Sequence, residues 1–276
     1  MNFRTDLAVE AVISCPVGEE DVEQNRRQMG SLTLHRMRIL THRGETAVGK
    51  PRGRYITATL PPLSDCEQDL AQHAAVIGGE LAAMLPPEGT VLVVGLGNRS
   101  VTPDAVGPAT AELVLATRHI RGEFARAVGL TDLRPTAVVV PGVLGQTGTE
   151  SSETVRGVCR EIHPAAVIVV DALAAGSMDR LGRTVQLCDS GIAPGSGVGN
   201  NRRPLNREVL GVPVIGMGVP TVVDAAPEGW ETPVMMTPRE IDLVISRAAR
   251  LLAMSIHAAL QPAYSPAELI EVARGI

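Results

Sequence analysis

Val167-Ile168-Val169-Val170-Asp171-Ala172-Leu173 is an apolar run that leads directly into a carboxylate, and it decides the fold together with a second run. The second run is Val91-Leu92-Val93-Val94, followed by Gly95-Leu96-Gly97-Asn98-Arg99-Ser100-Val101-Thr102-Pro103-Asp104. Near-continuous apolar runs of this length are typical of strands buried on both faces of a parallel sheet. Helical patterns separate them, so the sequence predicts an α/β fold with a doubly wound, largely parallel sheet and flanking helices.

Asp104 and Asp171 stand at or just beyond the ends of these two predicted strands. In an open α/β sheet, ligands and reactions collect outside the carboxyl ends of the strands. Two carboxylates that meet there can divide the work of acid and base between them. Each has a simpler structural explanation, as a helix cap or as an acceptor of loop amides. The pair is more informative than either residue, and it is our candidate catalytic pair.

Composition limits the function further. The 276 residues are 45% hydrophobic but only 2% aromatic, and the net charge is −5. An acidic balance argues against a nucleic-acid surface. The N-terminus has no apolar signal region and no apolar stretch is long enough to span a bilayer, so we expect a cytoplasmic protein without a membrane partner. The four cysteines form no C-x-x-C pair, and the histidines show no ligand spacing, so we expect neither a metal nor another cofactor.

The chain is organised around one α/β core at about 88–260, decorated by the segment that precedes it. We expect strands at 32–39, 55–60, 137–140, 184–187 and 212–217, and helices at 66–84, 104–117, 149–162 and 237–260. The charged stretch 19–27 is interpreted as a solvated face, and the basic turn 49–54 as a solvent loop. The predicted organisation is a single domain, 7–276, after a short presequence.

A glycine-rich loop at 191–199 is the second candidate site. Glycine lets backbone approach a ligand closely, so we expect substrate-binding groups here: Gly195, Ser196, Gly197 and Gly199. A flexible surface loop is the simpler interpretation. The string Gly95-Leu96-Gly97 invites a dinucleotide-binding hypothesis, but Ser100 stands where that fingerprint needs its third glycine. A non-enzymatic module that binds a nucleotide or small anion remains an alternative.

Longer strings carry a family resemblance, and together they span almost the whole chain. They are Arg4-Thr5-Asp6-Leu7-Ala8-Val9-Glu10-Ala11, Val94-Gly95-Leu96-Gly97-Asn98, Val101-Thr102-Pro103-Asp104, Thr117-Arg118-His119, Pro141-Gly142-Val143, Asp171-Ala172-Leu173-Ala174-Ala175, Asp189-Ser190-Gly191-Ile192, Pro194-Gly195-Ser196-Gly197-Val198-Gly199-Asn200 and Pro220-Thr221-Val222-Val223-Asp224-Ala225. With these strings the chain closely resembles the germination protease of spore-forming bacteria.

This resemblance implies an endopeptidase that degrades small acid-soluble spore proteins during germination, in the spore core or forespore. It implies a self-processing zymogen and a homo-oligomer, a tetramer in the family. The family's proposed catalytic aspartates match Asp104 and Asp171. Its core is similar to that of hydrogenase-maturation proteases, which hold a metal with Glu, Asp and His. Ala193 stands where many members have a candidate histidine, so we do not expect a three-ligand metal site. A metal-dependent maturation-type protease remains the enzyme alternative.

The start of the chain resembles the family's substrate motif. Thr5-Asp6-Leu7-Ala8-Val9-Glu10 offers an acidic residue, an apolar one, Ala, any residue and then Glu. The resemblance therefore implies a processing site between Asp6 and Leu7, which would release a six-residue presequence. The chain departs from many members in the short connection from Ala225 to Thr237.

Overall fold

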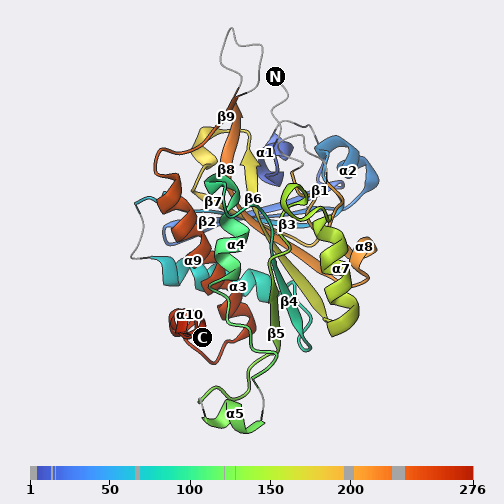
Figure 1. Cartoon of the computed structure of the whole chain (residues 1–276). Helices are drawn as coiled ribbons and strands as arrows, with labels where there is room; N and C mark the ends of the chain where they lie inside the picture. The colour runs from blue at the N-terminus through green and yellow to red at the C-terminus, as the bar shows by residue number, and fades with distance from the viewer. Residues whose placement is uncertain are drawn as a thin grey trace.

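The computed structural model describes residues 5–13, 15, 17–65, 69–120, 122–127, 129–195, 202–225 and 234–275. Within them lies a sheet of nine strands in the order β1-β2-β3-β7-β8-β6-β4-β5, with β9 paired to β8 (Figure 1). The strands are β1 Val22–Met29, β2 Leu32–Ile39, β3 Gly53–Thr59, β4 Val91–Gly95, β5 Thr136–Val139, β6 Ala166–Ala175, β7 Thr184–Cys188, β8 Val214–Ala225 and β9 Val234–Met236.

One half of the sheet is parallel, as the apolar runs predict. Strands β8, β6, β4 and β5 run side by side in the same direction. Every residue of β4 is buried, and so is nearly all of β6, which explains why both read as continuous apolar runs. The α/β class with flanking helices is confirmed.

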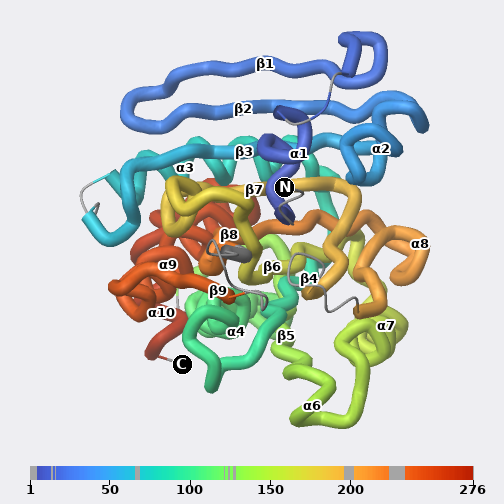
Figure 2. The backbone as a smooth tube through the Cα atoms, turned by 90° about the horizontal axis from the view of Figure 1, so that it is seen from above, coloured from blue at the N-terminus to red at the C-terminus, as the bar shows by residue number. Residues whose placement is uncertain are grey.

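The other half is antiparallel, so the sheet is mixed rather than largely parallel. The N-terminal strands were expected only to decorate the core, but β3 pairs with β7 and joins β1 and β2 to the central sheet (Figure 2). The charged stretch 19–27 is exposed as expected except at Asp21 and Val22, which are buried, and it also forms most of the edge strand β1. Charged side chains on an edge discourage pairing with another chain.

Helices cover both faces of the sheet (Figure 1). On one face, α3 Leu70–Ala82, α4 Val106–Ala111, α9 Ile241–Leu260 and α10 Pro266–Gly275 pack on the larger apolar core. On the other, α7 Ser151–Ile162 and α8 Arg207–Leu210 close a smaller one. The remaining helices are α1 Ala8–Ile13, α2 His42–Val48, α5 Gly122–Ala127, α6 Leu144–Thr147 and the 3₁₀ turns η1 Thr102–Asp104 and η2 Met178–Arg180.

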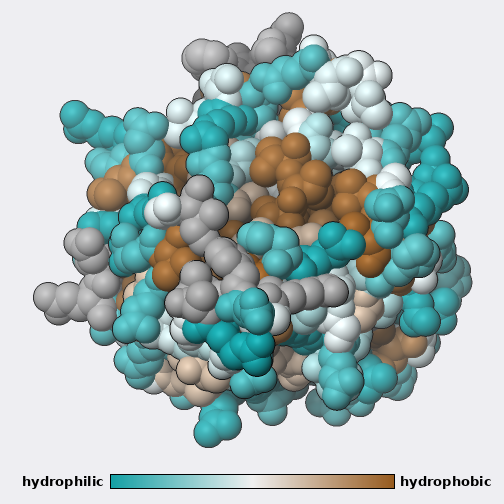
Figure 3. All heavy atoms as spheres, turned by 60° about the horizontal axis from the view of Figure 1, so that its bottom comes forward, coloured by the Kyte–Doolittle hydropathy of each residue, from teal (hydrophilic) through white to brown (hydrophobic). Residues whose placement is uncertain are grey.

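Helix α9 is long and apolar enough to cross a membrane by length and composition, but it is largely buried inside the fold, as a core helix would be. Hydrophobic residues also reach the surface. Figure 3 shows one face on which they gather in one area among hydrophilic neighbours.

Several helix ends differ from expectation because local hydrogen bonds decide them. The helix expected over 104–117 is shorter, since η1 and then α4 replace it. Helix α7 begins at Ser151 rather than at 149, after a capping box between Glu150 and Glu153. Helix α9 begins at Ile241 rather than at 237, and its N-cap residue Glu240 makes no side-chain cap hydrogen bond.

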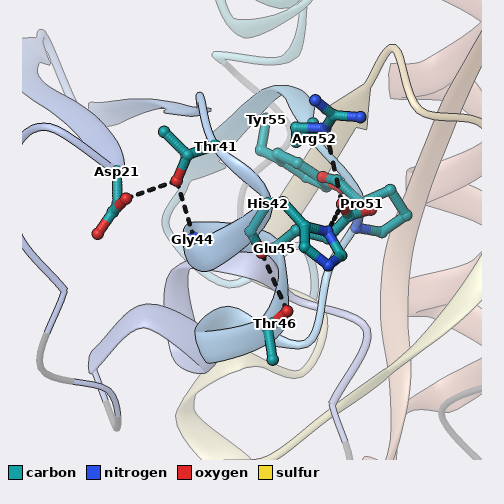
Figure 4. Close-up of polar contacts among 9 residues, drawn as sticks. All are labelled: Asp21, Thr41, His42, Gly44, Glu45, Thr46, Pro51, Arg52 and Tyr55. Carbon is teal, nitrogen blue, oxygen red and sulfur yellow. Dashed lines mark hydrogen bonds and ion pairs between the residues drawn. The ribbon is translucent and has the colours of Figure 1, made fainter.

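A polar cluster around α2 fixes the basic turn 49–54 (Figure 4). Thr41 caps the helix, because its hydroxyl accepts a hydrogen bond from the Gly44 amide. The same hydroxyl donates a hydrogen bond to Asp21. The Tyr55 hydroxyl donates to the Pro51 carbonyl at 2.7 Å. The turn is therefore held in place, and this places Lys50 beside the N-terminal segment.

Candidate active site

A cleft of about 580 Å³ opens at the carboxyl ends of β4 and β6. This is where a parallel sheet of this kind exposes its loops to a ligand. The loop after β4, the start of α7, the end of β6, part of β8 and the N-terminal segment all contribute to it. Its lining includes Asp6, Asp104, Asp171, Ala174 and Gly195.

Asp104 ends the 3₁₀ turn that follows β4. Its Oδ2 accepts a hydrogen bond from the Asn98 amide at 2.7 Å. Burial raises the pKa of Asp104, and the Asn98 hydrogen bond opposes this by favouring the ionised form. Gly97 makes the close approach possible, because its φ is +118° and a Cβ there would lie 1.9 Å from the Asp104 carbonyl oxygen.

Asp171 lies within β6 and is only 6% exposed. Its Oδ1 accepts a hydrogen bond from the Ala172 amide at 2.9 Å. Burial raises the pKa of Asp171 well above its usual range, and the negative charges of Asp104 and Asp6 raise it further. Strand β6 continues past Asp171 to Ala175, so the aspartate stands inside the strand rather than at its end.

The two aspartates therefore form an unequal pair. Both line the cleft, and the charge of Asp104 acts on Asp171. Asp171 is the more deeply buried and also feels the charges of Asp104 and Asp6, so its neutral form is favoured although the Ala172 amide opposes this. Asp104 faces the cleft with a backbone donor that favours its ionised form. When two carboxyls interact in different surroundings their proton affinities separate, and here burial and the neighbouring charges raise the pKa of Asp171 well above its usual range.

The N-terminal segment lies in the same cleft. The Asp6 amide donates to the Ala174 carbonyl at 2.9 Å, and the Ala174 amide donates to Asp6 Oδ2 at 2.8 Å. Leu7 is fully buried in an apolar cluster with Val9, Leu173, Ala175, Leu181 and Val223. The expected processing site thus adjoins the strand that carries Asp171.

Further contacts hold this segment on its other side. The Lys50 ammonium donates to the Thr5 carbonyl at 2.8 Å, and the Gly176 amide donates to Glu10 Oε2 at 2.7 Å. Burial lowers the pKa of Lys50, while the charge of Asp6 opposes this. The basic turn was interpreted as a solvent loop, and for Lys50 that was wrong. Its partner lies 45 residues away in sequence, a contact that spacing could not reveal.

The glycine-rich loop is only partly described. Gly195 lines the cleft, as expected of a substrate-binding residue, whereas Ser196, Gly197 and Gly199 lie outside the described residues. Local sequence patterns did not single out Arg202 and Arg203, which also line the cleft. Arg202 Nη1 lies 3.9 Å from Oε1 of Glu150, the N-cap residue of α7. Arg203 Nη1 lies 3.8 Å from Oε1 of Glu153 in that helix. Basic side chains at the rim can attract an acidic substrate.

The donor set does not fit a three-ligand metal site. Among the residues that the structure describes, no group of three His, Cys, Asp or Glu side chains could hold a metal ion. Ala193, at the position where a histidine was considered, is exposed and carries no donor in its side chain. We therefore derive no chemical step through a metal.

Comparison with known proteins gives a consistent result. Residues 16–232 match the germination protease family. The chain is 35% identical to the germination protease of Caldanaerobacter subterraneus subsp. tengcongensis, over 98% of this chain and 97% of that protein. It is 34% identical to the Clostridium perfringens (strain ATCC 13124) germination protease, over 95% of this chain and 96% of the relative. It is 39% identical to the germination protease of Priestia megaterium, over 90% of this chain and 69% of that protein.

Among solved structures, the chain is similar to the [NiFe] hydrogenase maturation protease HycI from Thermococcus kodakarensis KOD1. The TM-score is 0.39 and the identity 20%, over 64% of this chain and 98% of that chain. A likeness at this level adds nothing to the mechanism, which depends on the side chains of the cleft.

Proposed function

Because the chain belongs to the germination protease family, we propose that it is an endopeptidase that begins the degradation of small acid-soluble spore proteins. The observation that carries this proposal is the meeting of Asp104 and Asp171 in one cleft that also receives a segment of peptide chain. Paired carboxyls of unequal pKa beside a bound peptide can hydrolyse an amide bond.

In the proposed mechanism, ionised Asp104 accepts a proton from a water molecule as the water oxygen attacks the scissile carbonyl carbon. Protonated Asp171 donates a hydrogen bond to the carbonyl oxygen and then gives its proton to the leaving amine. The carbon–nitrogen bond breaks as that proton is transferred. Burial suits Asp171 to the acid role, and the Asn98 amide suits Asp104 to the base role.

The N-terminal segment supports self-processing as part of this function. Asp6 and Leu7 are bound against β6, so a cut between them would release the first six residues and begin to empty the cleft. An acidic residue followed by an apolar one is also the substrate pattern that the family resemblance implies. Assembly as a homo-oligomer, a tetramer in the family, and location in the forespore or spore core belong to the same proposal and rest on the family alone.

The rival binding-module hypothesis is not favoured by the geometry. An anion bound by the Gly95–Asn98 turn would need backbone amides that are open to it. The Asn98 amide instead donates to Asp104, and the carboxylate stands where the anion would approach. Two negative groups would compete for the same donors.

Substitution of each aspartate tests the function. Asp104→Asn and Asp171→Asn keep the size of the side chains and remove the acid–base pair, so both should lose cleavage of a spore protein while remaining folded. Circular dichroism and thermal melting provide the folding control. Two folded variants that cut at the wild-type rate would show that the pair is not catalytic.

A further inference from the structure

Gln186 of β7 holds the main chain on both sides of the Asp6–Leu7 peptide bond. Its Nε2 donates to the Asp6 carbonyl oxygen at 2.9 Å, and its Oε1 accepts from the Ala8 amide at 2.7 Å. Gln186 is only 6% exposed, so water competes little for these bonds. A single buried side chain thus fixes three successive residues of the N-terminal segment.

The strand register places this glutamine in the same row as a proposed catalytic aspartate. Gln186 is opposite Gly218 of β8, and Gly218 is opposite Asp171 of β6. Residues directly opposite one another share a face of the sheet, and two strand spacings put their Cα atoms roughly 9–10 Å apart. Gly218 has no side chain between them, and a Cβ there would lie 2.8 Å from Leu173 Cγ.

The main chain of Asp6 bridges this row. On the β6 side it bonds to Ala174, and on the β7 side its carbonyl bonds to Gln186. The scissile carbonyl of the expected processing site is therefore held at an ordinary hydrogen-bond distance by an uncharged amide donor. Such donors stabilise an oxyanion when they lie about 2.7–3.1 Å from it.

We propose that Gln186 is the oxyanion-binding residue for self-cleavage between Asp6 and Leu7, an inference that rests on the proposed endopeptidase function. Attack by water, which gives a proton to Asp104, forms a carbon–oxygen bond and moves the carbonyl electron pair onto the Asp6 oxygen. The Gln186 Nε2–H group donates to that oxygen beside Asp171. Collapse of the intermediate re-forms the carbonyl and breaks the bond to the Leu7 nitrogen, which takes the Asp171 proton. Gln186 Oε1 keeps the Ala8 amide, on the leaving side, in register.

Two substitutions separate this role from simple anchoring. Gln186→Glu keeps an acceptor for the Ala8 amide but, when ionised, has no donor for the oxyanion. Gln186→Met keeps the length of the side chain without either group. Gln261→Met is the matched control, because Gln261 is also buried and clamps the amide and carbonyl of Arg134 with the same two atoms, whereas its bonds do not reach the N-terminal segment.

The experiment follows the purified full-length precursor by mass spectrometry, as the rate at which chains starting at Leu7 appear. Hydrogen exchange of residues 5–13 reports, in the same samples, how much of the segment stays bound. We expect both Gln186 variants to self-cleave about 10²–10³-fold more slowly, which is the usual effect of losing one oxyanion donor. The fold-loss in cleavage rate should exceed the fold-loss in exchange protection of residues 5–13. Gln186→Glu should recover relative to wild type as the pH falls, because a protonated carboxyl can donate. Gln261→Met should cleave at the wild-type rate.

Near-wild-type self-cleavage by both variants would overturn the inference. A rate loss that matches the loss of exchange protection would overturn it too, since Gln186 would then only anchor the segment. Wild-type protein that digests a spore protein but leaves Asp6–Leu7 intact would refute self-processing and this inference together, and would leave the endopeptidase function standing. Wild-type protein that cuts neither would refute the proposed function itself.

Discussion

Replacing Asp171 by Asn should make the protein inactive and more stable at neutral pH. Asp171 is 6% exposed, and burial with the neighbouring charges of Asp104 and Asp6 raises its pKa well above the usual range. The folded state therefore carries a cost for holding this carboxyl, which is what a catalytic acid requires. Asn keeps the shape and its Oδ1 can still accept the Ala172 amide, so the cost should disappear with the acid.

The magnitude follows from linkage. Each unit by which folding raises the pKa of an acid costs about 1.4 kcal/mol of stability at a pH above both pKa values. We expect a gain of about 1–2 kcal/mol, as is common for single stabilising substitutions. For a chain of this length that is a rise in Tm of about 2–4 °C. The sign fixes the pH window: the gain is full above the folded-state pKa of Asp171 and vanishes below about pH 4, where the carboxyl is protonated in both states.

The assay is thermal melting of wild-type and Asp171→Asn protein across this pH range, with cleavage measured on the same preparations. Asp104→Asn is the comparison, and its gain should be smaller because Asp104 is less buried and its Asn98 hydrogen bond favours the charged form. A lower Tm for Asp171→Asn at neutral pH, or a gain that persists unchanged below about pH 4, would refute the electrostatic reasoning.

Three further outcomes are expected. Proteolysis should survive exhaustive chelation, because Ala193 offers no side-chain ligand; loss of activity restored by one divalent ion would contradict this. Asp6→Ala should trap the precursor, since it removes the carboxylate that accepts the Ala174 amide, and N-terminal sequencing after incubation at mildly acidic pH measures this. A persistent Met1 in protein that fully digests its spore substrate would show that the presequence does not inhibit. Gly97→Ala should destabilise the fold by more than about 1 kcal/mol and displace Asp104. Gly79→Ala should do neither, because a Cβ there would meet nothing within 4 Å. Equal melting curves for the two variants would refute the packing argument.

The parallel half of the fold was predictable from the sequence because burial on both faces leaves a continuous apolar run. The runs at 91–94 and 167–170 became β4 and β6, which pair in parallel. The antiparallel half was harder to predict. Strand β1 is exposed along most of its length, so its sequence carries no apolar period, and only its pairing with β2 makes it a strand.

The candidate site shows the same division. Local sequence pattern was sufficient to select three residues of the site, because two follow apolar runs and one lies in a glycine-rich loop. They are Asp104, Asp171 and Gly195, and the structure brings all three to one cleft. Lys50 and Gln186 act through contacts of 45 and 180 residues in separation. No local spacing encodes such contacts, because they depend on how β3 and β7 bring distant segments beside the N-terminus.

Cleavage of a purified small acid-soluble spore protein, mapped by mass spectrometry, tests the central claim most directly. Wild-type protein, Asp104→Asn and Asp171→Asn are incubated with the same substrate, with or without chelator. The account predicts that the wild-type protein makes a small number of cuts, each between an acidic residue and the apolar residue after it, and that neither variant makes any. An intact substrate after incubation with processed wild-type protein, or the same cuts made by both variants, would contradict it.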